Sequence, residues 1–286
     1  MLTDLQVNPD QQMPMPFQAA DDYAQRVMGW AQAFDASAHP AMTVQRDVAY
    51  GEHRLHRYNM FSPAGAHNAP VVIFWHGGGW TNGYRDYNTF MAPHITAIGC
   101  VLVSPSYRLV TEVKLPAAFD DGLAALAYVC QHIASSGGDP KRVYLAGHSA
   151  GAHLAALVAL RAPTDVRACL PISGIMDLHH PSPAPGSLEE RVYSMVLSDA
   201  AQDSVLSPIC WTAGNRVPFD LCVGEHDSER VRLSNRRMLE LLKLQNADAT
   251  LRVMPGQSHF DTHTSLNDGH AMWYQRLKNI IKETSP

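Results

Sequence analysis

The sequence predicts a doubly wound, mostly parallel α/β sheet, built as one domain over residues 1–286. Two observations favour this fold class. From about residue 70 onward, short runs rich in β-branched residues alternate with helical patterns, which is typical of parallel sheets with helices on both faces. The runs are also almost continuously apolar, as expected for strands buried on both faces. They lie at 71–75, 100–104, 142–146, 166–172, 219–223 and 250–254.

Three long helices are expected between these strands. In residues 120–134, apolar side chains from Leu123 to Ile133 recur at three- and four-residue spacing, which places them on one face of a helix. Residues 150–162 and 228–245 have similar patterns. Each of these helices would pack its apolar residues against the sheet.

Two regions stand outside the alternation of strands and helices. Residues 1–45 are expected to form an N-terminal helical segment, with an amphipathic stretch at 21–34. Residues 179–208 are rich in Pro and Ser around a short helical pattern at 188–197, and we interpret them as a cap-like insertion. In α/β enzymes such segments tend to lie over the C-terminal edge of the sheet and shape a pocket. Simple packing on the outside is the alternative.

The composition indicates a soluble globular protein, with 46% hydrophobic and 17% charged residues. A net charge of −5 argues against a nucleic-acid partner, because phosphate binding needs clustered Lys and Arg. No apolar run approaches the roughly 18 residues of a membrane span. The N-terminus lacks the basic start and apolar core of a signal peptide, and the five cysteines are widely spaced. We therefore expect a cytoplasmic protein with reduced thiols and no membrane partner.

The strongest local motif is GHSAG at 147–151, which fits the pattern G-x-S-x-G. It lies between a predicted strand and a predicted helix, as this nucleophile motif requires. A tight turn that exposes Ser149 leaves no room for side chains two positions away, and glycines occupy both positions. Ser149 would also lie at a helix N-terminus, where negative charge is stabilised. We interpret Ser149 as the nucleophile of a hydrolase.

A serine nucleophile needs a base, and the base needs an acid that orients it. In this type of sheet the acid follows the serine and precedes the histidine. GEHDSE, after the strand at 219–223, offers Glu225, Asp227 and Glu229. We favour Asp227, which directly precedes the helix expected from Ser228. Capping of that helix is the alternative role for Asp227.

The predicted base is His259, the first histidine after the strand at 250–254. His263 is the competing candidate, whereas His226 is too close to Asp227 in sequence. A metal hydrolase is a further hypothesis, but none of the histidine pairs has the acidic partner and helical frame of H-E-x-x-H. These pairs are His53 with His56, His179 with His180, and His259 with His263. We expect neither a metal nor an organic cofactor.

Three glycines in HGGGW (76–80) follow the apolar strand at 71–75. Acyl transfer passes through an oxyanion that needs backbone N–H donors, and glycines let the backbone approach the substrate closely. We expect these donors from Gly77, Gly78 and Ala150, with Gly79 as a third candidate among the glycines. His76 would brace the loop. Residues near these loops are candidates for substrate binding: Gly79, Trp80, Tyr84 and Phe260.

With these residues identified, the chain resembles the α/β-hydrolase superfamily over roughly residues 45–280. The segments SYRL…LPAAFDDGLAALAYV (106–129) and GGDPKRVYLAGHSAG (137–151) are similar to carboxylesterases related to hormone-sensitive lipase. In that group the glycine loop and the residue after the serine form the oxyanion hole. The resemblance therefore implies the same role for Gly77, Gly78 and Ala150.

A second resemblance is closer in detail. GHSAGAHLA (147–155), GEHDSERVRLSNRRM (224–238) and SHFD (258–261) are similar to kynurenine formamidases, or arylformamidases, which remove formate from N-formylkynurenine. The triad implied by this resemblance is Ser149, Asp227 and His259. The chain departs from that group at Gly79, where formamidases commonly carry a bulky aromatic residue.

These observations favour a serine hydrolase that cleaves a small acyl substrate, with an aryl formamide such as N-formylkynurenine as the leading candidate. A short-chain carboxylesterase is the alternative. A binding protein that has lost catalysis would show a broken triad or glycine loop, and both are intact in this sequence. No segment marks a subunit interface, so a homo-oligomer is left open.

Overall fold

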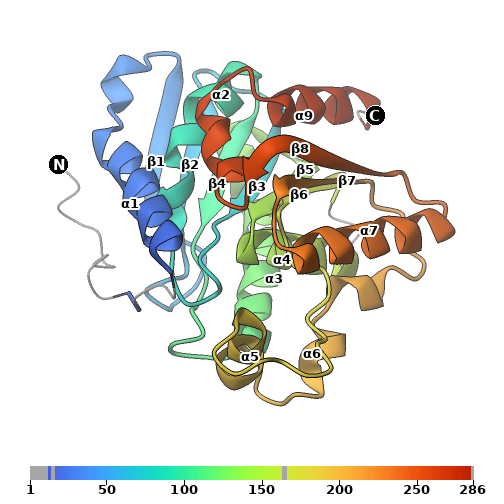
Figure 1. Cartoon of the computed structure of the whole chain (residues 1–286). Coiled ribbons are helices and arrows are strands. Elements are labelled where there is room, and N and C mark those ends of the chain that lie inside the picture. The colour runs from blue at the N-terminus through green and yellow to red at the C-terminus, as the bar shows by residue number, and fades with distance from the viewer. Residues whose placement is uncertain (1–11, 14–16, 163–165, 285–286) are drawn as a thin grey trace.

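A twisted sheet of eight strands runs through the part of the chain that the structure describes, in the order β1-β2-β4-β3-β5-β6-β7-β8 (Figure 1). The structure is a computed structural model and describes residues 12–13, 17–162 and 166–284. Strand β2 is antiparallel to both β1 and β4, and the remaining pairs are parallel. The strands are β1 (Met42–Ala49), β2 (Arg57–Pro63), β3 (Ala69–Trp75), β4 (Val101–Pro105), β5 (Gly138–His148), β6 (Ala168–Ile172), β7 (Phe219–His226) and β8 (Ala249–Ser258).

All six predicted strands are present, as β3 to β8. Strands β1 and β2 were not predicted, and β1 begins inside the expected N-terminal helical segment. The register of β1 on β2 shifts between Gln45 and Val48, where Asp47 has a φ of 60°. Because this bulge interrupts the alternation of buried and exposed residues, the strand has no clear period of two.

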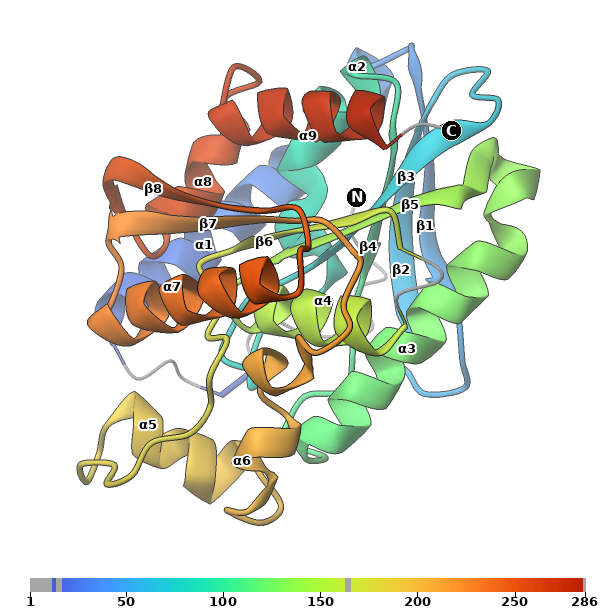
Figure 2. The same cartoon turned by 90° about the vertical axis from the view of Figure 1, so that its right-hand side faces the viewer.

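The three predicted helices correspond to α3 (Leu115–His132), α4 (Ala150–Arg161) and α7 (Glu229–Leu244), which cover one face of the sheet. Helices α2 (Ala92–Ala97) and α9 (Met272–Glu283) lie on the opposite face (Figure 2). Helix α4 is buried from Ala150 to Leu160 because it packs between the sheet and other helices, and its residues are apolar on nearly all sides. The sequence alternation thus predicts the layered architecture correctly.

Helix α1 (Gln18–Ala33) accounts for the amphipathic stretch expected at 21–34. Its buried residues include Ala20, Tyr23 and Val27, and the helix packs on the helical turn η3 (Arg85–Met91). Residues 1–11 and 14–16 of the predicted N-terminal segment lie outside the described residues. Helix α1 runs along the side of the molecule where β1 lies (Figure 1).

The segment 179–208 forms α5 (Leu188–Arg191), a π-helical turn η6 (Val192–Val196) and α6 (Gln202–Val205). It extends beyond the layer of α3, α4 and α7, away from the sheet (Figure 2). None of the helices in the described ranges is long and apolar enough to cross a lipid bilayer. The remaining short helical elements are η2 (Ala36–Ala38), η4 (Ile133–Ser136), η7 (Pro208–Trp211), α8 (Asp261–Thr264) and η8 (Ser265–Asn267).

Four histidines of the described residues are buried in the core around the carboxyl ends of the strands: His76, His148, His153 and His263. Burial lowers the pKa of His76 to about 4, of His153 to about 4 and of His263 to about 3. His153 is on α4, where its Nε2 donates to the carbonyl of Leu206 at 2.7 Å. These side chains stay neutral in the folded protein across the range in which an unfolded chain protonates them.

This burial predicts that stability falls as the pH drops below about 6.5, because the unfolded chain then binds protons that the folded chain excludes. The variant His153→Gln keeps a side-chain donor but removes one titrating group. Between pH 7 and pH 5, we expect the unfolding free energy of the variant to fall by about 2 kcal/mol less than that of the wild type. Urea unfolding at the two pH values measures this difference. Equal losses in both proteins would contradict the assignment.

Candidate active site

Ser149 occupies the tight turn between β5 and α4. Its backbone has φ 54° and ψ −119°, a conformation that an L-residue adopts only under strain. A Cβ on Gly147 would collide with the carbonyl of Gly151, and a Cβ on Gly151 would collide with the carbonyl of Trp75. The two glycines of GHSAG are therefore required by the close approach of β3, β5 and α4.

The structure brings Ser149, His259 and Asp227 together at the carboxyl edge of the sheet. The Nε2 atom of His259 lies 2.9 Å from Oγ of Ser149, and its Nδ1 lies 2.6 Å from Oδ1 of Asp227. Because a carboxylate accepts the hydrogen of Nδ1, Nε2 is left to accept the serine proton. The three side chains come from the ends of β5, β7 and β8. This is the geometry of a nucleophile, a base and an orienting acid.

Asp227 is buried beneath His259 and accepts two further hydrogen bonds. Its Oδ2 receives the hydroxyl of Ser173 at 2.6 Å and the backbone N–H of Gly224 at 2.7 Å. Burial acts to raise the pKa of Asp227, but the hydrogen bonds and charge attraction of His259, together with the bonds from Ser173 and Gly224, hold it below the ordinary value. The carboxylate is thus kept in its charged form.

The competing candidates for the acid and the base lie elsewhere. Glu225 and Glu229 are exposed, and Glu225 accepts the backbone N–H of Gly256 instead. His263 is fully buried and its Nδ1 is 2.8 Å from the hydroxyl of Tyr23. The cap of helix α7 is Ser228, which accepts the N–H of Val231, so Asp227 has no capping role.

The backbone of His259 is held by two side chains that the sequence did not single out as partners. Its carbonyl accepts hydrogen bonds from Nε2 of His148 and from the hydroxyl of Thr262, both at 2.8 Å. Burial, with the neighbouring His263 and His259, lowers the pKa of His148 well below its ordinary value. A neutral His148 therefore connects the nucleophile turn directly to the loop that carries the base.

Ser173 is a further site residue that sequence reasoning missed. It directly follows β6, has a φ of 53°, and donates its backbone N–H to the carbonyl of Cys222 at 2.7 Å. Its position at the end of a predicted strand was an available signal, because the carboxyl ends of parallel strands share one edge. Nothing in its local sequence indicates the contact with Asp227, which lies 54 residues away.

The glycine loop lies beside the nucleophile as predicted, but the glycines that line the cavity are not the expected pair. Gly78 and Gly79 have φ values of 120° and 60° and line the cavity beside Ser149 and Ala150. Gly77 does not line the cavity. It packs against the nucleophile turn instead, and a Cβ added there would meet Nδ1 of His148 at 2.9 Å. Proximity to the cavity thus favours Gly78 and Gly79 over Gly77 as donors.

His76 lies beneath this loop and is fully buried. Its Nδ1 is 2.8 Å from the carbonyl of Gly77, and its ring stacks on Tyr107 with centroids 4.4 Å apart. The hydroxyl of Tyr107 also donates to the carbonyl of His76 at 3.1 Å. These contacts fit the bracing role expected for His76.

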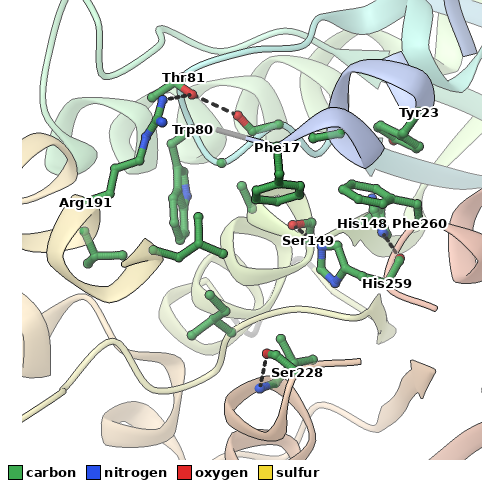
Figure 3. A pocket seen from close by; sticks show the side chains of 18 of the residues that line it. Phe17, Tyr23, Trp80, Thr81, His148, Ser149, Arg191, Ser228, His259 and Phe260 are labelled. Carbon is green, nitrogen blue, oxygen red and sulfur yellow. Dashed lines mark hydrogen bonds between the residues drawn. The ribbon is translucent and has the colours of Figure 1, made fainter. Parts of the chain in front are cut away.

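A cavity of about 280 Å³ opens above Ser149, and its walls are mainly apolar. Both segments outside the strand–helix alternation contribute to it: Phe17 and Tyr23 around α1, and Val192 and Val196 after α5. Figure 3 shows Trp80 along one wall, and His259 and Phe260 across from it. An apolar enclosure of this kind excludes water from the reacting atoms.

Two of the predicted aromatic wall residues, Trp80 and Phe260, line this cavity, as does Gly79. The prediction for Tyr84 is wrong. Its side chain is fully buried and packs on Tyr87 at a ring-centroid distance of 5.3 Å, outside the cavity lining. Tyr84 lies between the turn at Gly83 and η3, whose residues are all buried, so its ring is enclosed in the core.

The histidine pairs considered as metal ligands are engaged otherwise. His56 bonds Asp121 at 3.0 Å, and His179 bonds Asp203 at 2.7 Å. Within the described ranges, no group of three or more His, Cys, Asp or Glu side chains is arranged to hold a metal ion.

Comparison with known proteins agrees with this fold. The chain matches the sequence profile of the α/β-hydrolase fold over residues 72–262. It belongs to the α/β-hydrolase fold family. The match begins in β3, directly before the glycine loop, and includes Ser149, Asp227 and His259.

Individual relatives are esterases by name. The chain is 43% identical to carboxylesterase NlhH of Mycobacterium tuberculosis over 93 residues, which cover 32% of this chain and 29% of that protein. It is 36% identical to a probable isoprenylcysteine alpha-carbonyl methylesterase of Oryza sativa subsp. japonica over 118 residues, covering 41% and 28% of the two chains. Only about a quarter to a third of these relatives' length is therefore matched.

A solved structure supports the fold over nearly the whole chain. An esterase from Pyrobaculum calidifontis superposes with a TM-score of 0.79 at 22% identity and covers 93% of both chains. At this identity the likeness concerns the fold.

The bond from Ser173 to Asp227 predicts a pH-dependent defect in the variant Ser173→Ala. Without this hydrogen bond the pKa of Asp227 rises, so the carboxylate protonates at higher pH and ceases to orient His259. A fluorophosphonate reagent, which modifies activated serines, should label Ser149 about tenfold more slowly, and the acid limb of the rate–pH profile should move toward neutral pH.

Ser234→Ala is the matched control, because Ser234 is also a buried, hydrogen-bonded serine but bonds only Val231 and Met176. Its profile should coincide with that of the wild type. A Ser173→Ala profile unchanged in shape, with only a lower melting temperature, would reduce Ser173 to a structural role.

Proposed function

We propose that this protein is a serine carboxylesterase that hydrolyses small acyl esters. The observation that carries the proposal is the relay in which His259 contacts both Ser149, at 2.9 Å, and Asp227, at 2.6 Å, on the floor of an apolar cavity. The names of the matched relatives support the ester as the substrate. Membership of the family supplies the fold but does not select the substrate.

In the acylation step, Oγ of Ser149 attacks the ester carbonyl while Nε2 of His259 takes the serine proton. The carbonyl oxygen becomes negative, and the backbone N–H groups of Gly78, Gly79 and Ala150 are the proposed donors that stabilise it. As the tetrahedral intermediate collapses, the carbon–oxygen bond to the alcohol breaks and His259 gives its proton to the departing alcohol. An acyl-enzyme remains on Ser149.

Deacylation repeats these events with water. His259 removes a proton from water, the resulting hydroxide attacks the acyl carbonyl, and the same donors stabilise the second oxyanion. The acid leaves as the proton returns from His259 to Oγ of Ser149. Throughout, Asp227 holds the imidazole in the tautomer that has hydrogen on Nδ1 and stabilises the imidazolium when it forms.

Aryl formamides, the leading candidate from the sequence, are the second candidate substrates, because the matched relatives are named esterases and the resemblance to arylformamidases rests on sequence motifs alone. Those motifs, at 147–155, 224–238 and 258–261, all surround the triad. They therefore bear on the hydrolytic machinery, which esters and formamides share, and less on the cavity that selects the acyl group. Comparing kcat/KM for p-nitrophenyl butyrate and N-formylkynurenine tests which class is preferred, and the esterase proposal expects the ester to be the better substrate.

Replacement of the nucleophile should abolish ester hydrolysis. Ser149→Ala is expected to lower kcat for p-nitrophenyl butyrate by about 10⁶-fold, because no acyl-enzyme can form. The melting temperature should stay close to that of the wild type, since the alanine removes only a cavity-facing hydroxyl. Normal turnover in a correctly folded Ser149→Ala protein would rule out the mechanism.

Replacement of the acid tests the orientation of the base. Asp227→Asn should lower kcat by roughly 10⁴-fold, because an amide donates to Nδ1 and favours the wrong tautomer of His259. Glu225→Gln is the control, since Glu225 is exposed and bonds only backbone. A small effect of Asp227→Asn with a large effect of Glu225→Gln would reassign the acid.

A further inference from the structure

Three charged side chains, all near α5, line the mainly apolar cavity above Ser149. They are Glu189 and Arg191 on α5, and Arg230 on α7. Two positive charges and one negative charge leave the lining with a positive excess. The remaining titratable residues that line the cavity are histidines and tyrosines.

Glu189 and Arg230 neutralise each other. The Nη1 atom of Arg230 lies 3.4 Å from Oε1 of Glu189, and its Nη2 donates to the carbonyl of Leu178 at 2.7 Å. Burial opposes ionisation of Glu189, but the bond from its own backbone N–H and the charge of Arg230 hold its pKa below the ordinary value. Arg230 thus anchors the start of the cap-like insertion.

Arg191 has a different environment. Its Nη2 contacts only neutral acceptors, the hydroxyl of Thr81 at 3.3 Å and the sulfur of Met13 at 3.0 Å. Among the described residues, no carboxylate lies within ion-pair distance of it. Its side chain is partly buried, next to Trp80 on the cavity wall (Figure 3). An arginine in an apolar enclosure without an anionic partner is costly unless a ligand supplies one.

The contact with Thr81 also links Arg191 to the catalytic loop. The hydroxyl of Thr81 is 3.3 Å from the carbonyl of Gly78 and donates to Oδ1 of Asn82 at 2.6 Å. The guanidinium is therefore held against the loop that carries the proposed oxyanion donors, and a substrate bound at Ser149 shares one cavity with it.

We propose that Arg191 makes this site selective for esters that carry a carboxylate away from the scissile bond. This inference rests on the proposed esterase function and names its substrate class. A planar guanidinium binds a carboxylate through paired hydrogen bonds, and the apolar walls strengthen that interaction by excluding water. The same walls accommodate the chain or ring that joins the carboxylate to the ester.

The test compares two matched pairs of esters, and in each pair one ester has a carboxylate where the other has a neutral group. Mono-p-nitrophenyl adipate and p-nitrophenyl hexanoate place the carboxylate, or a methyl group, on the acyl chain. p-Carboxyphenyl butyrate and p-carbamoylphenyl butyrate place the carboxylate, or an amide, on the leaving group. In at least one pair, Arg191→Met should lower the ratio of kcat/KM for the charged over the neutral ester by about tenfold or more.

Two further variants make the comparison specific. Arg191→Lys keeps the positive charge but loses the planar guanidinium with its paired donors, and it should retain part of the preference for the charged ester. Arg236→Met removes the same charge from the exposed face of α7, outside the cavity lining, and should leave both ratios unchanged. Ratios unaffected by Arg191→Met in both pairs would overturn the proposal.

Failure of the esterase function would give a different result, namely no hydrolysis of the neutral esters by the wild type. In that case calorimetry on the Ser149→Ala protein decides the matter without turnover. The p-nitroanilide of adipic acid should bind more tightly than that of hexanoic acid, and adding Arg191→Met should remove the difference. Equal binding of the two anilides would overturn the proposal.

Discussion

The turn that carries Ser149 is the constraint around which the other parts of the site are arranged. Ser149 has a φ of 54°, and the turn needs glycines at positions 147 and 151, because side chains there would collide with the carbonyls of Gly151 and Trp75. Strands β3 and β5 and helix α4 must therefore approach one another through backbone atoms. That close approach also brings the glycine loop, which follows β3, beside the nucleophile.

The base and the acid are held to this turn by a continuous set of hydrogen bonds. His148, the neighbour of Ser149, donates to the carbonyl of His259, while Ser173 donates to the carboxylate of Asp227. Thr262 lies between them, with its hydroxyl 2.8 Å from Oγ of Ser173 and 2.8 Å from the carbonyl of His259. Four loops after β5, β6, β7 and β8 are thereby positioned relative to one another. Preorganisation of this kind lowers the reorganisation that the reaction requires.

The substrate cavity has a different origin from the catalytic machinery. Its upper walls come from α1 and from the segment 179–208, neither of which belongs to the strand–helix alternation. In the proposed mechanism the machinery is common to esters and formamides, whereas these outer segments form the walls that would contact the rest of the substrate. Arg191, on α5 and against Thr81, places a positive charge in this part of the cavity, on which the proposed preference for carboxylate-bearing esters rests.

The sequence by itself determined the layered α/β fold, the nucleophile turn and the identity of the acid and base candidates. These features depend on local patterns: buried strands are continuously apolar, and GHSAG needs glycines at fixed positions. The sequence did not reveal β1, because a bulge breaks its period of two, or β2, because its buried run is interrupted by the polar residues Asn59 and Ser62. Only the tertiary structure decided that Gly77 and Tyr84 lie outside the cavity lining and that Ser173 supports Asp227. Those roles arise from contacts between residues distant in the chain, and local sequence patterns do not predict such contacts.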